Sequence, residues 1–265
     1  MKVVLWISTF VISFSALINV SAAEVKEYNV CAVPNFYNFL NDINNLYKQE
    51  KNKNFSLYFD TSSNLYALIM NKGIKCDIYF GSDLSFHKKY IKSGLSNESY
   101  VSVFASTPLV LLSHNESISE CNEIDLEHEK IAIPNPSLYA SGYEANKIIK
   151  HIKDNNYKNN RNRFNRRYKL LNNNTVYGDN EFQVLSFYLN NNVNHSIIPY
   201  NIYFNNKQLT NDKTCYYDNI AEDLLFYTLR FSNKSNDILE YIYSISDEIY
   251  KDNGLRKVNN KYDRE

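Results

Sequence analysis

The sequence predicts an α/β protein in which strands and helices alternate along the chain. Tyr28–Val33 is a short apolar run typical of a strand, and the apolar residues from Phe36 to Tyr47 recur at helical spacing. The polar turn Pro34-Asn35 separates these two segments, and comparable turns follow several later apolar runs. Alternation of this kind is typical of layered sheets whose strands are largely parallel.

The other elements follow in order from the same two periodicities. Helices are expected after the first strand, after the cap signal at Thr61, from near Gly142, over 181–189, and from about Asn219 and Asp237. The expected strands are short β-prone runs at 28–33, 55–59, 76–80, 101–112, 131–133, 175–177 and 197–198. In such sheets a ligand binds where the carboxyl ends of strands lead into helices. A functional site is therefore expected at these ends.

The N-terminus has the pattern of a secretory signal peptide. Lys2 precedes the apolar run Val3–Val20, and the small residues Ser21 to Ala23 follow it. We expect cleavage after Ala23, which makes residues 1–23 the signal peptide and places the mature protein in the periplasm or otherwise outside the cytoplasm. An uncleaved membrane anchor is the alternative, because the run nearly reaches the length of a spanning helix. Polar residues within the run favour cleavage.

Charge and short motifs weigh against two classes of function. The sequence has 29 Lys and Arg and 29 Asp and Glu, so its formal charge gives no sign of nucleic-acid binding. We interpret the basic segment Lys158–Lys169 as a solvated helix or loop. The sequence lacks a Gly-rich phosphate loop, a Gly-x-Ser-x-Gly elbow and a His-Glu-x-x-His zinc motif. It therefore gives no support for an enzyme.

Four cysteines, Cys31, Cys76, Cys121 and Cys215, allow three disulfide pairings in an oxidising compartment. Their spacing does not suggest a metal centre, and no cofactor is expected. Cys31 and Cys76 lie in apolar, strand-like runs and are interpreted as buried thiols. Cys121 and Cys215 lie in polar stretches and are the better candidates for a disulfide.

Short polar residues occupy four of the expected strand-to-helix junctions, at 34–35, 61–63, 140–142 and 178–181. Each alone is an ordinary helix cap. Together they suggest more, because helix N-termini carry unpaired N–H groups and a partial positive charge that suit an anion. Neutral donors also avoid leaving a buried cation unpaired when the site is empty. The junctions therefore suggest a site for an anion.

At these junctions the sequence resembles the molybdate-binding proteins of bacterial ABC transporters. Val30–Ile43 is similar to that family's first strand and helix, in the variant with Asn-Phe at the first binding turn. Phe59–Asp83 resembles its Ser-rich turn and following strand, and Lys130–Ala145 its second-lobe strand and turn. Gly178–Asn201 resembles the variant's Gly-Glu-Asn block. The four segments occur in the family's order and together cover essentially the whole mature chain.

The resemblance implies a type II periplasmic-binding-protein fold with two lobes and a ligand cleft between them. Each lobe would be a mixed, largely parallel sheet flanked by helices. The first lobe would comprise residues 24–106 and 206–265, and the second lobe residues 107–205.

The resemblance also implies the ligand-binding residues. Asn35 and Ser62 would bind from the first lobe, and Ser141 and the backbone N–H of Glu181 from the second. A further ligand is expected at Tyr200, with the neighbouring Pro199 as the alternative position.

The function that the resemblance implies is capture of a tetrahedral oxyanion, molybdate or tungstate, for the membrane permease of an ABC importer. The partners would be this anion and the permease, with no nucleic acid and with the protein as a monomer. The alternative is an exported sensor or interaction protein that kept the fold and changed or lost its ligand.

Overall fold

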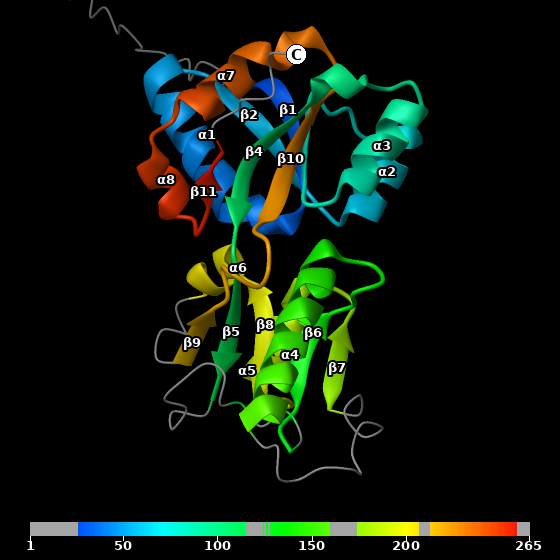
Figure 1. Cartoon of the computed structure of the whole chain (residues 1–265). Coiled ribbons are helices and arrows are strands. Elements are labelled where there is room, and N and C mark those ends of the chain that lie inside the picture. Colours follow the sequence, from blue (N-terminus) through cyan, green and yellow to red (C-terminus); the bar gives the residue numbers. More distant parts are fainter. Residues whose placement is uncertain are drawn as a thin grey trace, which may run out of the picture.

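The structure consists of two α/β lobes, each built on one sheet and joined by crossing segments of the chain (Figure 1). It is a computed structural model that describes residues 26–114, 124, 126, 128–159, 174–206 and 213–258. The expected signal peptide, residues 1–23, lies outside these residues. Within the described part of the chain, no helix has the length and apolar character needed to cross a membrane. The predicted two-lobed fold is confirmed.

The first lobe contains a six-stranded mixed sheet in the order β11-β4-β10-β3-β1-β2. Its strands are β1 (Lys26–Ala32), β2 (Asn54–Phe59), β3 (Ile78–Gly81), β4 (Val101–Thr107), β10 (Leu224–Arg230) and β11 (Arg256–Lys257). The strand β1 is parallel to β2 and β3, whereas β10 is antiparallel to both β3 and β4. The parallel strands β1, β2 and β3 therefore end at the same edge of this sheet.

Helices cover both faces of the first sheet (Figure 1). They are α1 (Tyr37–Lys51), α2 (Ser62–Met70), α3 (Leu84–Lys92), α7 (Asn236–Ser244) and α8 (Asp247–Lys251), with short 3-10 turns η1 (Pro34–Phe36), η2 (Glu98–Tyr100) and η4 (Asn233–Ser235). In α1, Ile43 follows Phe39 by four residues and Leu40 by three, and all three side chains are buried. Burying each of them stabilises the fold by roughly 1.5–3 kcal/mol. The apolar residues whose spacing predicted this helix thus form the side that faces the core.

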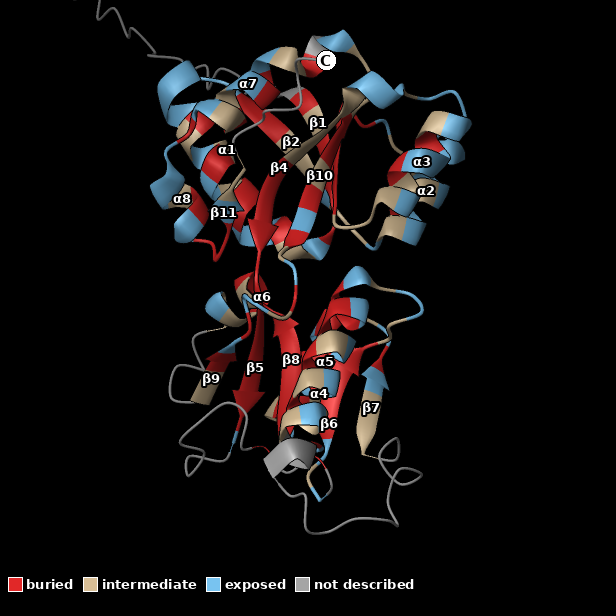
Figure 2. Ribbon diagram, in the orientation of Figure 1, coloured by how far each residue is buried: buried red, intermediate tan, exposed pale blue. Residues whose placement is uncertain are grey.

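The second lobe contains a five-stranded sheet in the order β7-β6-β8-β5-β9. Its elements are β5 (Leu109–Ser113), β6 (Ile131–Pro134), α4 (Ala140–Asn159), β7 (Thr175–Gly178), α5 (Glu181–Leu189), β8 (His195–Pro199), α6 (Tyr200–Phe204) and β9 (Lys213–Tyr216). Figure 2 shows that the strands at the centre of both sheets are mostly buried. Most of the basic segment 158–169 lies outside the described residues.

The apolar stretch 101–112, predicted as one strand, forms two strands in different lobes. Pro108 separates β4 from β5, and the chain crosses there from the first sheet to the second. Proline has no N–H to donate to a sheet, so a break in strand pairing at this residue is expected. The second lobe was predicted to start at residue 107, which is the last residue of β4, and the first strand of the second sheet begins at Leu109.

The chain returns to the first lobe later than the sequence suggested. The return was predicted at residue 206, but β9 pairs with β5 in the second sheet, with Val110 opposite Tyr216. The helix predicted from about Asn219 was also wrong, because 224–230 forms β10. This strand alternates between buried and more exposed residues over its first four positions, which is a strand period rather than a helical one. The helix predicted from about Asp237 is present as α7.

The prediction for the first two cysteines was wrong. Cys31 and Cys76 form a disulfide with their Cα atoms 5.9 Å apart. Both are buried because the bond lies beneath α2 and α3, so an apolar setting did not distinguish a bonded cysteine from a free thiol. Cys215 is also disulfide-bonded, and Cys121 lies outside the described residues.

Replacing both Cys31 and Cys76 by alanine should lower the free energy of unfolding by about 4 kcal/mol, because the bond restricts the unfolded chain. Guanidinium denaturation of the oxidised wild type and the double variant measures this. An unchanged denaturation midpoint and slope would contradict the assigned role of the bond.

Candidate functional site

A small cavity of about 20 Å³ lies between the lobes, with room for one water-sized molecule. Residues from both lobes line it, namely Asn35, Ser82, Asp83, Tyr139, Ala140, Ser141, Glu181, Pro199, Leu224 and Phe226. Most of them follow the carboxyl ends of β1, β3, β6, β7 and β8. This is where an open α/β sheet is expected to bind its ligand.

Asn35 and Asp83 form much of the first-lobe wall. Asn35 lies in η1 directly after β1, and its carbonyl accepts a hydrogen bond from the side-chain amide of Asn201 at 3.2 Å. Asp83 caps α3, since its carboxylate accepts from the backbone N–H and the hydroxyl of Ser85, each at 2.7 Å. The turn Gly81-Ser82-Asp83 closes a buried strand as the four predicted junctions do, and this signal could have identified Asp83.

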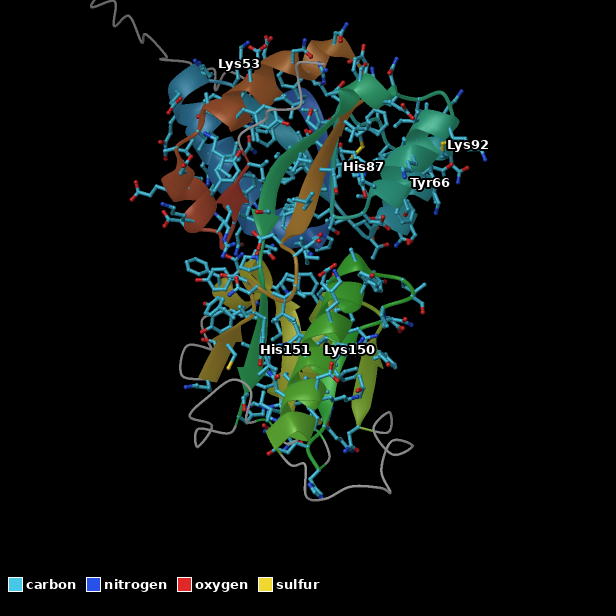
Figure 3. The ribbon with its side chains drawn as sticks, in the orientation of Figure 1. Lys53, Tyr66, His87, Lys92, Lys150 and His151 are labelled. Atoms are coloured by element: carbon cyan, nitrogen blue, oxygen red, sulfur yellow. A yellow bond between two sulfur atoms is a disulfide. The ribbon has the colours of Figure 1, made fainter. Side chains whose placement is uncertain are left out.

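His87 holds the Asp83 turn from behind. Its ring is buried on the inner side of α3, next to β10, and its Nδ1 lies 2.9 Å from the Asp83 carbonyl (Figure 3). Burial lowers the pKa of His87. Gly81 is required in this turn because a Cβ there would lie 2.7 Å from the Tyr79 ring and 2.9 Å from that of His87. His87 therefore supports the wall and does not line the cavity.

Ser62, predicted as a ligand, is not among the residues that line the cavity. It begins α2, which Thr61 caps by accepting from the Asn64 N–H. The Ser62 hydroxyl accepts a hydrogen bond of 2.9 Å from the hydroxyl of buried Tyr79. Ser62 therefore bonds to a residue of its own lobe and does not face the cavity.

The second-lobe wall joins Ser141 of α4 to Glu181 of α5. Both are buried, and the Ser141 hydroxyl donates to Glu181 Oε1 at 2.6 Å. Glu181 is the first residue of α5, after the cap Asn180, whose side chain accepts from the Gln183 N–H. Gly142 lets α4 begin against the end of β6, because a Cβ there would lie 2.2 Å from the Pro134 carbonyl oxygen. These contacts bring two predicted ligands together.

The chemistry of the lining is neutral or acidic. Ser82, Tyr139 and Ser141 supply hydroxyls, Asp83 and Glu181 supply carboxyls, and no lining residue is Lys or Arg. Burial raises the pKa of Glu181, against hydrogen bonds from Ser141 and from its own backbone N–H. Burial, and then the charges of Glu181 and Asp179, raise the pKa of Tyr139. The sequence predicted neutral donors, and the carboxyl groups of Asp83 and Glu181 were not predicted as part of the lining.

Tyr200 lies at the start of α6, and its ring packs against other aromatic rings. The ring centroids of Tyr203, Phe204 and Tyr216 lie 5.9, 5.6 and 5.7 Å from its own. Of the two alternatives left open by the sequence, Pro199 lines the cavity and Tyr200 does not.

A hydrogen-bonded junction behind the cavity connects the lobes. The Thr107 hydroxyl donates to the Gly254 carbonyl at 3.0 Å and accepts from the Asn201 N–H at 3.1 Å. Gly254 has φ +68°, and a Cβ there would lie 2.7 Å from the Asn201 Cα. Through Asn201, this junction links the first crossing of the chain, at Thr107, to the loop that carries Asn35.

A family model described as bacterial extracellular solute-binding protein matches residues 28–233. The chain belongs to this family. A comparison of the chain with curated proteins found no match.

Solved structures share the fold of this solute-binding protein. The substrate-binding domain assigned to a molybdenum ABC transporter of Clostridium difficile is 17% identical, with a TM-score of 0.63 over 89% of this chain and 100% of that one. The periplasmic molybdate-binding protein of Azotobacter vinelandii is 16% identical, with a TM-score of 0.66 over 88% and 100%. Peb3 of Campylobacter jejuni, also solved with L-phospholactate, is 16% identical, with a TM-score of 0.65 over 87% and 100%.

Replacing Glu181 by glutamine should make the stability of the solute-binding protein less dependent on pH. Because its pKa is raised in the fold, the folded protein binds a proton more readily than the unfolded chain, so ionised Glu181 lowers stability at high pH. This loss of stability disappears as the pH falls below the pKa of Glu181 in the folded protein and approaches its pKa in the unfolded chain. We expect the variant to be more stable at about pH 8 and equal to the wild type near about pH 4. Urea denaturation across this range checks it, and a gain independent of pH would refute it.

Proposed function

We propose that this solute-binding protein captures a tetrahedral oxyanion, molybdate or tungstate, between its lobes and delivers it to the permease of an ABC importer. The observation that carries the proposal is the cavity itself, where polar residues from the strand-to-helix junctions of both lobes converge without a lysine or arginine. Such a lining offers an anion neutral donors and leaves no buried cation unpaired in the empty protein.

Two helix N-termini strengthen the case for an anion. The first turns of α4 and α5 carry Ser141 and Glu181 into the lining, and N–H groups in a helix's first turn have no partner within the helix. They point their partial positive charge at a ligand near the helix end. The shared fold with the Clostridium difficile and Azotobacter vinelandii proteins, named for molybdenum and molybdate, supports this choice of anion.

We infer that the lobes open and close around the anion. Donors come from both lobes, so a bound anion stabilises the closed arrangement in which all of them reach it. An oxyanion is larger than one water molecule, so its entry requires the lobes to separate. The junction at Thr107, where the chain first crosses between the lobes, is the place for this movement.

The proposal includes the compartment and the absence of catalysis. We propose that residues 1–23 are removed on export and that the protein works outside the cytoplasm as a binding protein rather than an enzyme. The Cys31–Cys76 disulfide supports an oxidising compartment. Membership of an extracellular solute-binding family supports the same location.

Isothermal titration calorimetry with molybdate, tungstate, sulfate and phosphate tests the proposal. The first two should bind and the last two should not. Asn35→Ala and Ser141→Ala should each weaken binding roughly ten- to a hundredfold, as expected for losing a hydrogen bond to an anion worth roughly 1.5–3 kcal/mol. Ser137→Ala is the matched control, because Ser137 is exposed in the same lobe, just before α4, and is not in the lining.

The same titration assigns the role of Ser62. Its hydroxyl is bonded to Tyr79 outside the cavity, so Ser62→Ala should bind like the wild type. A loss of affinity as large as that of Ser141→Ala would restore Ser62 to the ligand set. No binding of any of the four anions would contradict the proposal and favour the alternative, an exported sensor or interaction protein of the same fold.

A further inference from the structure

The Glu181 carboxyl already uses one of the donors proposed for the anion. Ser141 Oγ donates to its Oε1 at 2.6 Å. Glu181 is 9% exposed and Ser141 2%, so solvent does not replace this bond. A carboxylate thus lies where the resemblance places one side of the oxyanion.

The charges around Glu181 make this arrangement unfavourable for a dianion. Asp83 faces the cavity from the first lobe, while Tyr139 before α4 and Asp179 before α5 are the other titratable groups acting at this end of the second lobe. None of them is a cation. A dianion that entered beside two ionised carboxylates would meet repulsion in a poorly solvated space, where charges interact more strongly than in water.

Resting on the proposed function, we propose that Glu181 is the specificity residue of the cleft and that a dianion binds there together with one proton, which Glu181 takes up. The proton comes from solvent and converts the carboxylate to a carboxylic acid. The acid O–H donates to an oxygen of the anion, and the Ser141 hydroxyl turns from Glu181 to the anion. One acceptor thereby becomes a donor, and the Ser141 hydroxyl is released to the ligand.

The position of Glu181 makes it the group that takes up the proton. Glu181 is buried, which favours its neutral acid, whereas the Asp83 carboxyl is engaged by two hydrogen bonds from Ser85. An oxyanion that carries its own hydrogen, such as hydrogen phosphate, would bring the proton with it and need no uptake. Dependence on pH is therefore expected for a fully deprotonated anion such as molybdate and not for an anion that carries its own proton, although phosphate itself is expected not to bind.

The test is calorimetry with molybdate in two buffers of different ionisation enthalpy, at a series of pH values from about 6 to about 9. The difference in measured enthalpy between buffers gives the number of protons taken up. For the wild type, uptake should approach one per anion at the top of the range, and affinity should fall about tenfold per pH unit there. Glu181→Gln, which cannot ionise and still accepts from Ser141, should take up none and bind with an affinity independent of pH.

Glu248→Gln is the matched control, since Glu248 also lies in a first helical turn, in α8, but is exposed and outside the cavity. It should show the uptake of the wild type. Binding by the wild type without uptake, or equal uptake by Glu181→Gln, overturns the role of Glu181 and leaves the proposed function standing. If the wild type binds no molybdate at any pH, both the role of Glu181 and the proposed function are overturned. Circular dichroism checks that each variant is folded.

Discussion

The hydroxyl of Thr107 lies where the two lobes meet, and the position of the cavity depends on its two hydrogen bonds. It ties the end of β4 to the Gly254 carbonyl near the C-terminal side and to the first turn of α6 through the Asn201 N–H. The Asn201 side chain extends this connection to the Asn35 carbonyl in the cavity wall. A loop of the first lobe is therefore held by a residue of the second. Because the two hydrogen bonds of the Thr107 hydroxyl are buried, losing either one would leave a polar group without water.

Much of the fold was predictable because its elements are local. Apolar spacing identified α1 and α5, and cap residues such as Thr61 and Asn180 marked where helices begin. What sequence spacing missed depended on distant partners. Nothing within 219–230 predicts that these residues enter a sheet between β3 and β4, two strands that lie much earlier in the chain. Nor does an apolar run around Cys31 or Cys76 indicate that the other cysteine lies next to it in the fold.

The site shows the same division. Asn35, Ser141 and Glu181 were predicted from the turns that hold them, and the structure brings all three to one cavity. Ser62 and Tyr200 have the residue types of ligands, but their side chains contact Tyr79 and the aromatic rings of α6 and β9 instead. Whether a hydroxyl faces inward or toward its own lobe depends on packing against residues far away in sequence. The acidic character of the lining was missed because the resemblance concerned the backbone of Glu181, not its side chain.

The place of β10 has a consequence for how the chain assembles. β3 and β4 are consecutive sheet strands in sequence, yet they do not pair, because β10 lies between them and bonds to both. A chain emerging from its N-terminus therefore presents two unpaired strand edges until residues 224–230 arrive, after the whole second lobe has been made. Open edges of this kind invite pairing with other chains. Completion of the first lobe should thus be a late, slow step, because it depends on long-range contacts. The chain should be most prone to aggregation before this step.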